Sequence, residues 1–289
     1  MKPDAPADNH RNEQRRERLQ TTSLTAWDLH RTREGAARDA RTRLMTMKTH
    51  ERLRLLAEAE LGVPKHQRSF LKHGRDGEPG VLMIHDTLQT PADYVPLGRT
   101  LNDAGLTVHG LLLADLGHGV TDRPEARWRA TMQRARVGYQ LLSETCDQVY
   151  VVGAGFGAVL ALHLADREKV AGLVLLAPAL APRVSLGIKL LQRFNLLHLP
   201  PVRRRLGPMV DAMDGMHQAQ NLAGKLRIPM FGVHCDDDEV ASPESLRILQ
   251  KKAGDRGRFR VFPEGGHEVL AAHGADGLEK DILEFIRRR

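Results

Sequence analysis

Short apolar runs alternate with longer amphipathic segments from about residue 70 to the end of the chain. The apolar runs are partly β-branched and have the length of buried strands. They are Val81–His85, Val108–Leu113, Val149–Val152, Leu173–Leu176, Met230–His234 and Phe259–Phe262. The segments with helical spacing are Tyr94–Ala104, Trp128–Leu142, Ala158–Ala165, Pro243–Lys252 and Ala275–Arg289. Strands that are apolar throughout and alternate with helices predict an α/β fold, with a mostly parallel sheet flanked by helices.

The region before residue 67 has a different pattern. Residues 1–22 are polar and rich in arginine, which predicts a disordered basic tail. Residues 23–66 predict a helical N-terminal arm, in which Thr49 is the expected N-cap and Gly62 follows the last turn. The expected apolar face consists of Leu53, Leu56, Ala57 and Leu61, at i, i+3, i+4 and i+8. Such an arm packs on its own domain, pairs with a second subunit in a homo-oligomer, or holds a protein partner.

The alternation of strands and helices is interrupted between about residues 181 and 227. An insertion between two late strands of a parallel sheet lies over their carboxyl ends, where ligands bind in open α/β folds. We therefore predict a short helical cap, within a domain that spans residues 67–289. Its first part, residues 181–208, mixes Leu, Ile and Phe with Arg and Lys, which favours acyl-chain or lipid-like ligands and peripheral membrane contact. A cap that only covers the core is the alternative.

Charge and cysteine content narrow the function classes. The net charge is +7, but 43 basic and 36 acidic residues are interspersed and aromatic residues make up only 4%, so nucleic-acid binding is not expected. The two cysteines, Cys146 and Cys235, exclude a disulfide scaffold and have no zinc-ligand spacing. The N-terminus has no apolar run typical of a secretory signal, so a cytoplasmic location is expected.

A glycine-rich turn follows the third apolar run. Gly153-Ala-Gly155-Phe156-Gly157 comes directly after Val149–Val152 and opens a helical segment. A phosphate-binding loop is one interpretation, but the spacing is not G-x-G-x-x-G and the lysine of a Walker loop is absent. The other is the strand-to-helix turn G-x-S-x-G, on which a nucleophilic serine sits between small residues. In this chain the central residue is a glycine.

Four further motifs occur in order around this turn. Upstream, the segment V-L-M-I-H-D-T contains an expected strand and ends in His85, Asp86 and Thr87. The segment Leu116-Gly-His118-Gly follows the next expected strand. Downstream, the strand from Met230 leads into Asp236-Asp237-Asp238, and Gly265-Gly-His267 precedes the last helix. Three adjacent acids also occur in metal loops, but EF-hand spacing is absent, and no metal or cofactor is expected.

Together these motifs resemble the α/β-hydrolase superfamily over residues 70–289, in particular the small carboxylesterases and monoacylglycerol lipases of the serine aminopeptidase-like group. The resemblance implies that His267 is the catalytic histidine, that Asp238 rather than Asp236 or Asp237 is its acid, and that Gly155 stands at the nucleophile position. It also implies that backbone N–H groups of Thr87 and Phe156 form the oxyanion hole and that His85 and Asp86 line the pocket. Asp86 departs from the family, which has glycine there, and His118 is expected to be structural.

Without a hydroxyl at Gly155, the covalent acyl-enzyme route is closed. Two functions remain open. The first is a pseudoenzyme that acts as a ligand-binding or interaction protein. The second is a hydrolase or lyase that uses the His267–Asp238 pair on a small ester- or acyl-type substrate without covalent catalysis. In both, Asp238 and His267 are expected to face each other beside an empty space at Gly155 that holds about one water.

Overall fold

The computed structural model describes residues 40–87, 89–113, 124–181 and 199–288. The chain forms two compact units, Met1–Thr42 and Arg43–Arg289, and the second contains every described strand. The predicted tail (1–22), the first part of the predicted arm (23–39), His118 and most of residues 181–208 lie outside the described residues. Among the described residues, no helix is long and apolar enough to span a membrane.

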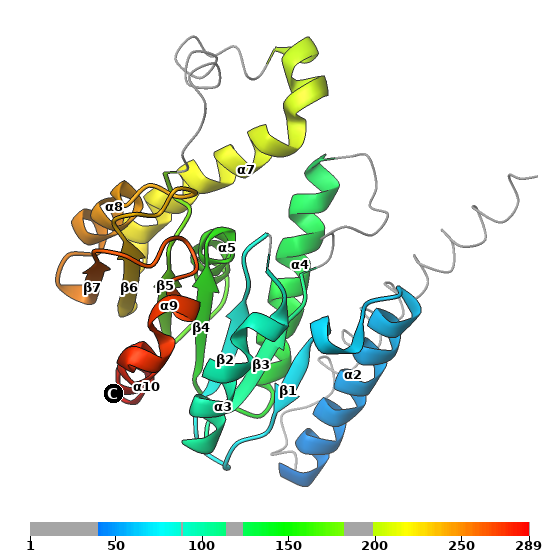
Figure 1. Ribbon diagram of the computed structural model, residues 1–289. Helices are drawn as coiled ribbons and strands as arrows, with labels where there is room; N and C mark the ends of the chain where they lie inside the picture. The colour runs from blue at the N-terminus through cyan, green and yellow to red at the C-terminus, as the bar shows by residue number, and fades with distance from the viewer. Residues whose placement is uncertain (1–39, 88, 114–123, 182–198, 289) are drawn as a thin grey trace, which may run out of the picture. The chain divides into compact units, whose positions relative to one another are not determined.

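A seven-stranded sheet forms the centre of the second unit, with the strand order β1-β3-β2-β4-β5-β6-β7 (Figure 1). All neighbouring pairs are parallel except β1 and β3. The strands are β1 (Phe70–Lys72), β2 (Gly80–Ile84), β3 (Thr107–Leu111), β4 (Val149–Ala154), β5 (Gly172–Leu176), β6 (Met230–Cys235) and β7 (Gly257–Phe262). The mostly parallel sheet and its six predicted strands are confirmed.

Helices cover both faces of the sheet (Figure 1). They are α2 (Ala40–Glu60), α3 (Val95–Asp103), α4 (Pro124–Ser143), α5 (Phe156–Ala165), α7 (Pro200–Lys225), α8 (Glu244–Ala253), α9 (Val269–His273) and α10 (Glu279–Arg287). Short helical turns lie at Lys65–Gln67, Pro91–Tyr94, Gly254–Arg256 and Gly274–Leu278. Because side chains alternate along a strand, Leu82 and Ile84 of β2 join one apolar cluster with α4, α5 and α7, whereas Val81 and Met83 join another with α3 and α10.

The parallel strands end at one edge of the sheet, and the motif residues follow these ends. Asp86 comes after β2, Gly155 after β4, Asp238 after β6 and His267 after β7. Carboxyl ends of parallel strands are where open α/β sheets place their ligand sites. The fold therefore brings residues from distant parts of the sequence to one place.

The first strand, β1, was not predicted. It has three half-buried residues at the edge of the sheet, too few to give a periodic pattern. Its antiparallel partner β3 provides Gly110, opposite Phe70. A Cβ atom on Gly110 would lie 2.2 Å from the Phe70 ring, so the aromatic side chain needs a glycine at this position.

Helix α2 differs from its prediction in two ways. Thr49 is not an N-cap, because it lies inside the helix and its hydroxyl donates to the Met45 carbonyl at 2.9 Å. The predicted apolar face is also wrong, since Leu53 and Leu56 are 60% and 53% exposed. Among the residues of α2 whose burial is described (45–60), the buried positions are instead Met47 and Glu58.

Hydrogen bonds to the Glu58 side chain connect α2 to the residue before β1. The Glu58 carboxylate accepts hydrogen bonds from the Ser69 backbone N–H at 2.8 Å and from the Ser69 hydroxyl at 2.6 Å. The same hydroxyl accepts from the Leu112 N–H at 2.8 Å. The compact unit that contains Glu58 and the sheet begins at Arg43.

Replacing Glu58 by alanine should lower the free energy of unfolding by about 1–3 kcal/mol, because two donors of Ser69 lose their acceptor in a buried place. Chemical denaturation of the full chain measures this change. The matched control is Glu60→Ala, an exposed glutamate of the same helix, which should stay within about 0.5 kcal/mol of the parent. Equal stability of the two variants would show that Glu58 does not hold α2 on the sheet.

Candidate active site

The turn between β4 and α5 has the backbone geometry of a tight strand-to-helix elbow. Gly155 has φ +51° and ψ −117°, which a side-chain-bearing residue adopts only with strain. Its neighbours must also be small, because a Cβ atom on Gly153 or Gly157 would lie 2.4 or 2.2 Å from backbone oxygens. The elbow is thus built in the manner that the motif predicted, with no hydroxyl at its tip.

Asp86 fills the space that a side chain at position 155 would need. A Cβ atom built on Gly155 would lie 2.2 Å from Asp86 Cγ and 2.4 Å from each carboxylate oxygen. These distances are far below van der Waals contact, so the Asp86 carboxylate and a side chain at position 155 exclude one another. The expectation of an empty space beside Gly155 was wrong, because Asp86 turns toward the elbow.

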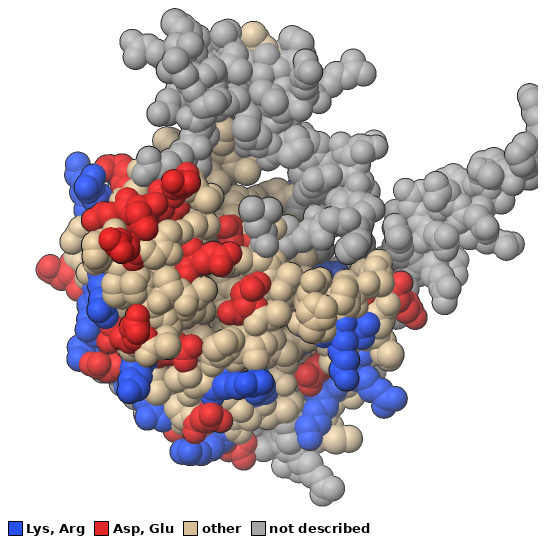
Figure 2. Space-filling model, in the orientation of Figure 1, with Lys and Arg blue, Asp and Glu red and all other residues tan. Residues whose placement is uncertain are grey.

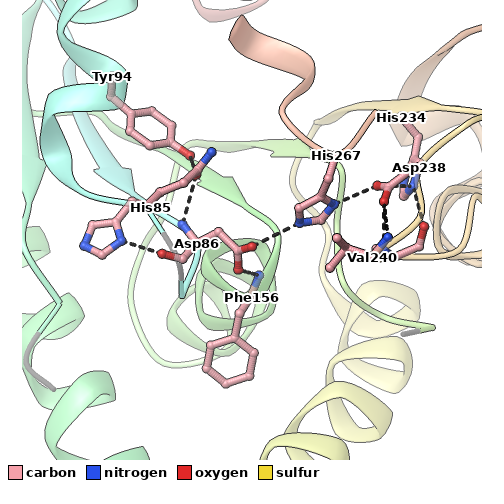
Figure 3. Close-up of polar contacts among 10 residues, drawn as sticks. His85, Asp86, Tyr94, Phe156, His234, Asp238, Val240 and His267 are labelled. Carbon is pink, nitrogen blue, oxygen red and sulfur yellow. Dashed lines mark hydrogen bonds and ion pairs between the residues drawn. The ribbon is translucent and has the colours of Figure 1, made fainter. Parts of the chain in front are cut away.

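The two oxygens of Asp86 have different partners (Figure 3). Oδ1 accepts a hydrogen bond from the Phe156 backbone N–H at 2.7 Å, and Oδ2 lies 3.0 Å from His267 Nε2. The Thr87 N–H also donates to this carboxylate. Phe156 and Thr87 are the two residues predicted to bind an oxyanion, and in the structure their N–H groups bind a side chain of the protein itself.

His267 links Asp86 to Asp238. Its Nδ1 lies 2.7 Å from Asp238 Oδ2, on the opposite side of the ring from Asp86. Asp238 is fully buried, and its Oδ1 accepts from the N–H groups of Val240 at 2.8 Å and Ala241 at 2.9 Å. The prediction that Asp238 and His267 face each other is confirmed as geometry.

A second histidine on Asp238 was not foreseen. His234 Nε2 lies 3.0 Å from Asp238 Oδ2, and His234 is completely buried in β6. Its only sequence signal is a histidine four residues before the acid, at the end of an apolar strand. The Asp237 carboxylate accepts hydrogen bonds from the N–H groups of Gly265 and Gly266. Asp237 therefore connects the loop after β6 to the loop after β7.

Hydrogen bonds of His85 and Gln89 fix the backbone of the loop that carries Asp86. His85 Nδ1 lies 2.6 Å from the Asp86 carbonyl oxygen, and His85 Nε2 accepts from the Leu113 N–H at 3.0 Å. Gln89 Oε1 accepts from the Tyr94 hydroxyl at 2.6 Å and from the Asp86 N–H at 3.3 Å. His85, which was predicted to line the pocket, is 1% exposed and positions the Asp86 backbone.

Asp86, His267 and Asp238 form a row of charged groups, and their hydrogen bonds shift one another's pKa values. Burial lowers the pKa of His267, but the hydrogen bonds with Asp238 and Asp86 outweigh burial and raise the pKa to about 9. Burial raises the pKa of Asp86, yet the hydrogen bonds from His267, Phe156 and Thr87 bring it below its usual range. The pKa of Asp238 is well below its usual range because His234, His267 and Ala241 outweigh its burial. At neutral pH the site therefore contains an imidazolium between two carboxylates.

Replacing Asp86 by asparagine should lower the pKa of His267 below about 9, because one of the two carboxylates that stabilise the imidazolium is lost. NMR titration of the His267 ring measures this pKa. The control is Asp281→Asn, which removes an exposed carboxylate paired with Arg260 and should leave the titration of His267 unchanged. An unchanged pKa in Asp86→Asn would show that Asp86 does not face His267 in solution.

Comparison with known proteins gives relatives among esterases and lipases. No protein-family model matches the sequence. A carboxylesterase from Bacillus subtilis (strain 168) is 24% identical over 241 residues, which cover 74% of this chain and 94% of the esterase. A thermostable monoacylglycerol lipase from Bacillus sp. (strain H-257) is 28% identical over 96 residues, which cover 33% of this chain and 38% of the lipase.

Two solved structures share the architecture. A metagenome-derived lipolytic enzyme superposes with a TM-score of 0.63 at 18% identity, over 78% of this chain and 99% of that one. The monoacylglycerol lipase of Paleococcus ferrophilus superposes with a TM-score of 0.59 at 18% identity, over 75% and 97% of the two chains. With its sheet order, its elbow after β4 and these similarities, the chain has the α/β-hydrolase fold and is related to carboxylesterases and lipases.

Proposed function

We propose that this protein is a pseudoenzyme with respect to acyl transfer, and that it works as a ligand-binding or interaction protein. One observation carries the proposal: the Asp86 carboxylate occupies the space that the side chain of a nucleophile at position 155 would need. The remaining contacts of Asp86 support the same conclusion for the oxyanion hole and for the catalytic base.

Ester hydrolysis by this fold needs a nucleophile, an oxyanion hole and a free base. Gly155 supplies no nucleophile. The Phe156 and Thr87 N–H groups already bind an anion, and a second anion beside the Asp86 carboxylate would be repelled. His267 is protonated up to about pH 9, so at neutral pH it has no lone pair on Nε2 to accept a proton.

The alternative, in which His267 and Asp238 activate water by themselves, has less support. It requires a neutral imidazole whose Nε2 is open to a water molecule. Here Nε2 faces the Asp86 carboxylate at 3.0 Å, and that carboxylate keeps the ring charged. The retained His267–Asp238 pair thus serves, in our proposal, to hold Asp86 in place.

The relationship to a monoacylglycerol lipase and to lipolytic enzymes supports an acyl- or lipid-like small ligand. On the face shown in Figure 2, Asp and Glu side chains gather toward the carboxyl ends of the strands, whereas most Lys and Arg side chains lie below them. A partner or homo-oligomer formed through the N-terminal arm and a cytoplasmic location remain part of the proposal.

The first test is direct. The wild-type protein should show negligible hydrolysis of p-nitrophenyl acetate and butyrate and should not be labelled by fluorophosphonate probes, because no activated hydroxyl exists at the elbow. Intact-mass spectrometry detects the label, and an active serine esterase treated in parallel is the positive control. Stoichiometric labelling of the wild-type protein would contradict the proposal.

The second test rebuilds a serine site. Gly155→Ser alone should stay inactive and lose stability, because the new side chain collides with Asp86. The double variant Asp86→Gly, Gly155→Ser removes the collision, vacates the oxyanion donors and leaves His267 with Asp238 alone. Its rate of p-nitrophenyl ester hydrolysis should exceed that of Gly155→Ser by about 10²-fold or more, a small part of the ~10⁶-fold that a serine nucleophile contributes in a protease.

Asp86→Gly is the matched control for the double variant, since it opens the same space without a hydroxyl. If Gly155→Ser is as active as the double variant, Asp86 is not the obstacle to acyl transfer. Activity in Asp86→Gly equal to that of the double variant would show that hydrolysis there needs no serine.

A further inference from the structure

We propose that the outer face of α2 is a membrane-contact surface, whose partner is a lipid bilayer with anionic headgroups. This outer face consists of the seven exposed residues of α2 between positions 45 and 60, which are Met45, Lys48, Thr49, Arg52, Leu53, Leu56 and Glu60. The inference goes beyond the proposed function, which does not identify the partner of the N-terminal arm. It also does not depend on whether the protein performs acyl transfer.

The opposite side of α2 packs on the domain through Met47 and two charged residues, Arg54 and Glu58. Met47 and Glu58 are buried, and the carboxylate of Glu58 accepts the two hydrogen bonds of Ser69. Nη1 of Arg54 donates to Nε2 of His109 in β3. Since Met47, Arg54 and Glu58 lie at i, i+7 and i+11, they share one face of the helix. Their contacts fix the rotation of α2 about its own axis.

The apolar residues of α2 face outward as a result. Met45, Leu53 and Leu56 are the three most exposed large apolar side chains among the described residues, at 62%, 60% and 53%. They lie at i, i+8 and i+11, which is again one face of a helix. A single exposed leucine is ordinary on a protein surface, but several such side chains on one helix face indicate a contact surface.

The charged residues around these apolar side chains are mostly basic. Among the exposed residues from 45 to 65, Lys48, Arg52 and Lys65 are basic and Glu60 is acidic. Figure 2 shows Lys and Arg side chains gathered in the region where Figure 1 places α2. Apolar and basic residues together on one side of a helix are the combination that binds the surface of an anionic bilayer.

A second copy of the chain fits this surface less well. A two-fold interface places a surface against itself, so Lys48 and Arg52 of one copy would meet a surface with the same basic residues. Stable interfaces also use about 20–30 residues on each side, whereas the outer face of α2 has seven. An anionic bilayer is complementary to the basic residues and requires no matching protein surface.

In the proposed contact, α2 stays on its domain and lies along the membrane surface. Leu53 and Leu56 enter the boundary between headgroups and acyl chains, while Lys48 and Arg52 bind lipid phosphates. Because only a few apolar side chains enter the bilayer, their contribution is modest and the charges are needed as well. Binding therefore depends on anionic lipid and weakens as salt screens the charges.

The experiment is co-sedimentation of the full-length protein with vesicles at low and at high salt. Vesicles of equal parts phosphatidylcholine and phosphatidylglycerol should bind the protein, and vesicles of phosphatidylcholine alone should bind it about tenfold less or weaker. The double variant Leu53→Gln, Leu56→Gln should bind the mixed vesicles about tenfold less, because it has lost the apolar area that enters the bilayer. Val261→Gln, which changes an exposed apolar residue of β7, is the matched control and should bind like the wild type.

A second pair of variants tests the charges. Lys48→Gln, Arg52→Gln should bind the mixed vesicles about tenfold less or weaker, since each basic residue near an anionic membrane contributes about fivefold. Lys251→Gln, Lys252→Gln removes the same two charges from the last turn of α8 and should bind like the wild type. All of these side chains are exposed, so thermal unfolding of the variants should match that of the wild type.

A fluorescent label locates the contact on α2. Both native cysteines are buried, so a thiol-reactive NBD dye will modify the introduced cysteine of Leu56→Cys. Its emission should shift to the blue when mixed vesicles are added, because the dye enters a less polar environment. The same dye on Glu244→Cys, an exposed position of α8, should show no shift.

Three results would overturn the proposal. The first is a wild-type protein that does not bind the mixed vesicles. The second is equal binding by the wild type and by Leu53→Gln, Leu56→Gln, since another surface would then contact the membrane. The third is a wild-type dimer, measured by light scattering, that Leu53→Gln, Leu56→Gln loses, because the outer face of α2 would then bind a second copy. Ester hydrolysis enters none of these measurements, so the proposed function is tested separately.

Discussion

The contact between Asp86 and His267 is the interaction on which the site depends. It joins a loop after β2 to a loop after β7, and through His267 it reaches Asp238 after β6. Each charge in this row depends on the next one. Asp238 and Asp86 keep His267 protonated, and His267 keeps both acids ionised.

Burying a charge costs free energy unless the charge is paired and hydrogen-bonded. Asp86 and Asp238 are both paired with His267 and hydrogen-bonded to backbone N–H groups. Asp238 receives two backbone N–H groups, and Asp86 receives those of Phe156 and Thr87. The loops at the strand ends thus provide the donors that make a buried row of charges stable. Gly155 completes the arrangement by leaving room, since any Cβ atom there would strike Asp86. Gly155 and Asp86 therefore form one structural unit, and a change at either position alters what the other can do.

Much of the architecture could be predicted from the sequence, because it depends on repeating patterns. The apolar runs predicted six strands, and parallel strands necessarily bring Asp238 and His267 to one edge. The position of Asp86 could not be predicted in this way, because the direction of one side chain depends on the absence of another at Gly155, far along the chain. The buried face of α2 was missed for a related reason: it is anchored by Glu58 and Ser69, and polar anchors leave no hydrophobic periodicity. His234 gave only the weak signal of a histidine within an apolar strand.

The central claim is that the Asp86 carboxylate occupies the space that a side chain at position 155 would need. A crystal structure of the full chain at neutral pH, at a resolution that separates the two carboxylate oxygens, tests it most directly. The account predicts Asp86 Oδ1 within hydrogen-bonding distance of the Phe156 N–H, Oδ2 within hydrogen-bonding distance of His267 Nε2, and no water between Gly155 and His267. An Asp86 side chain turned toward solvent, with ordered water between Gly155 and His267, would contradict it.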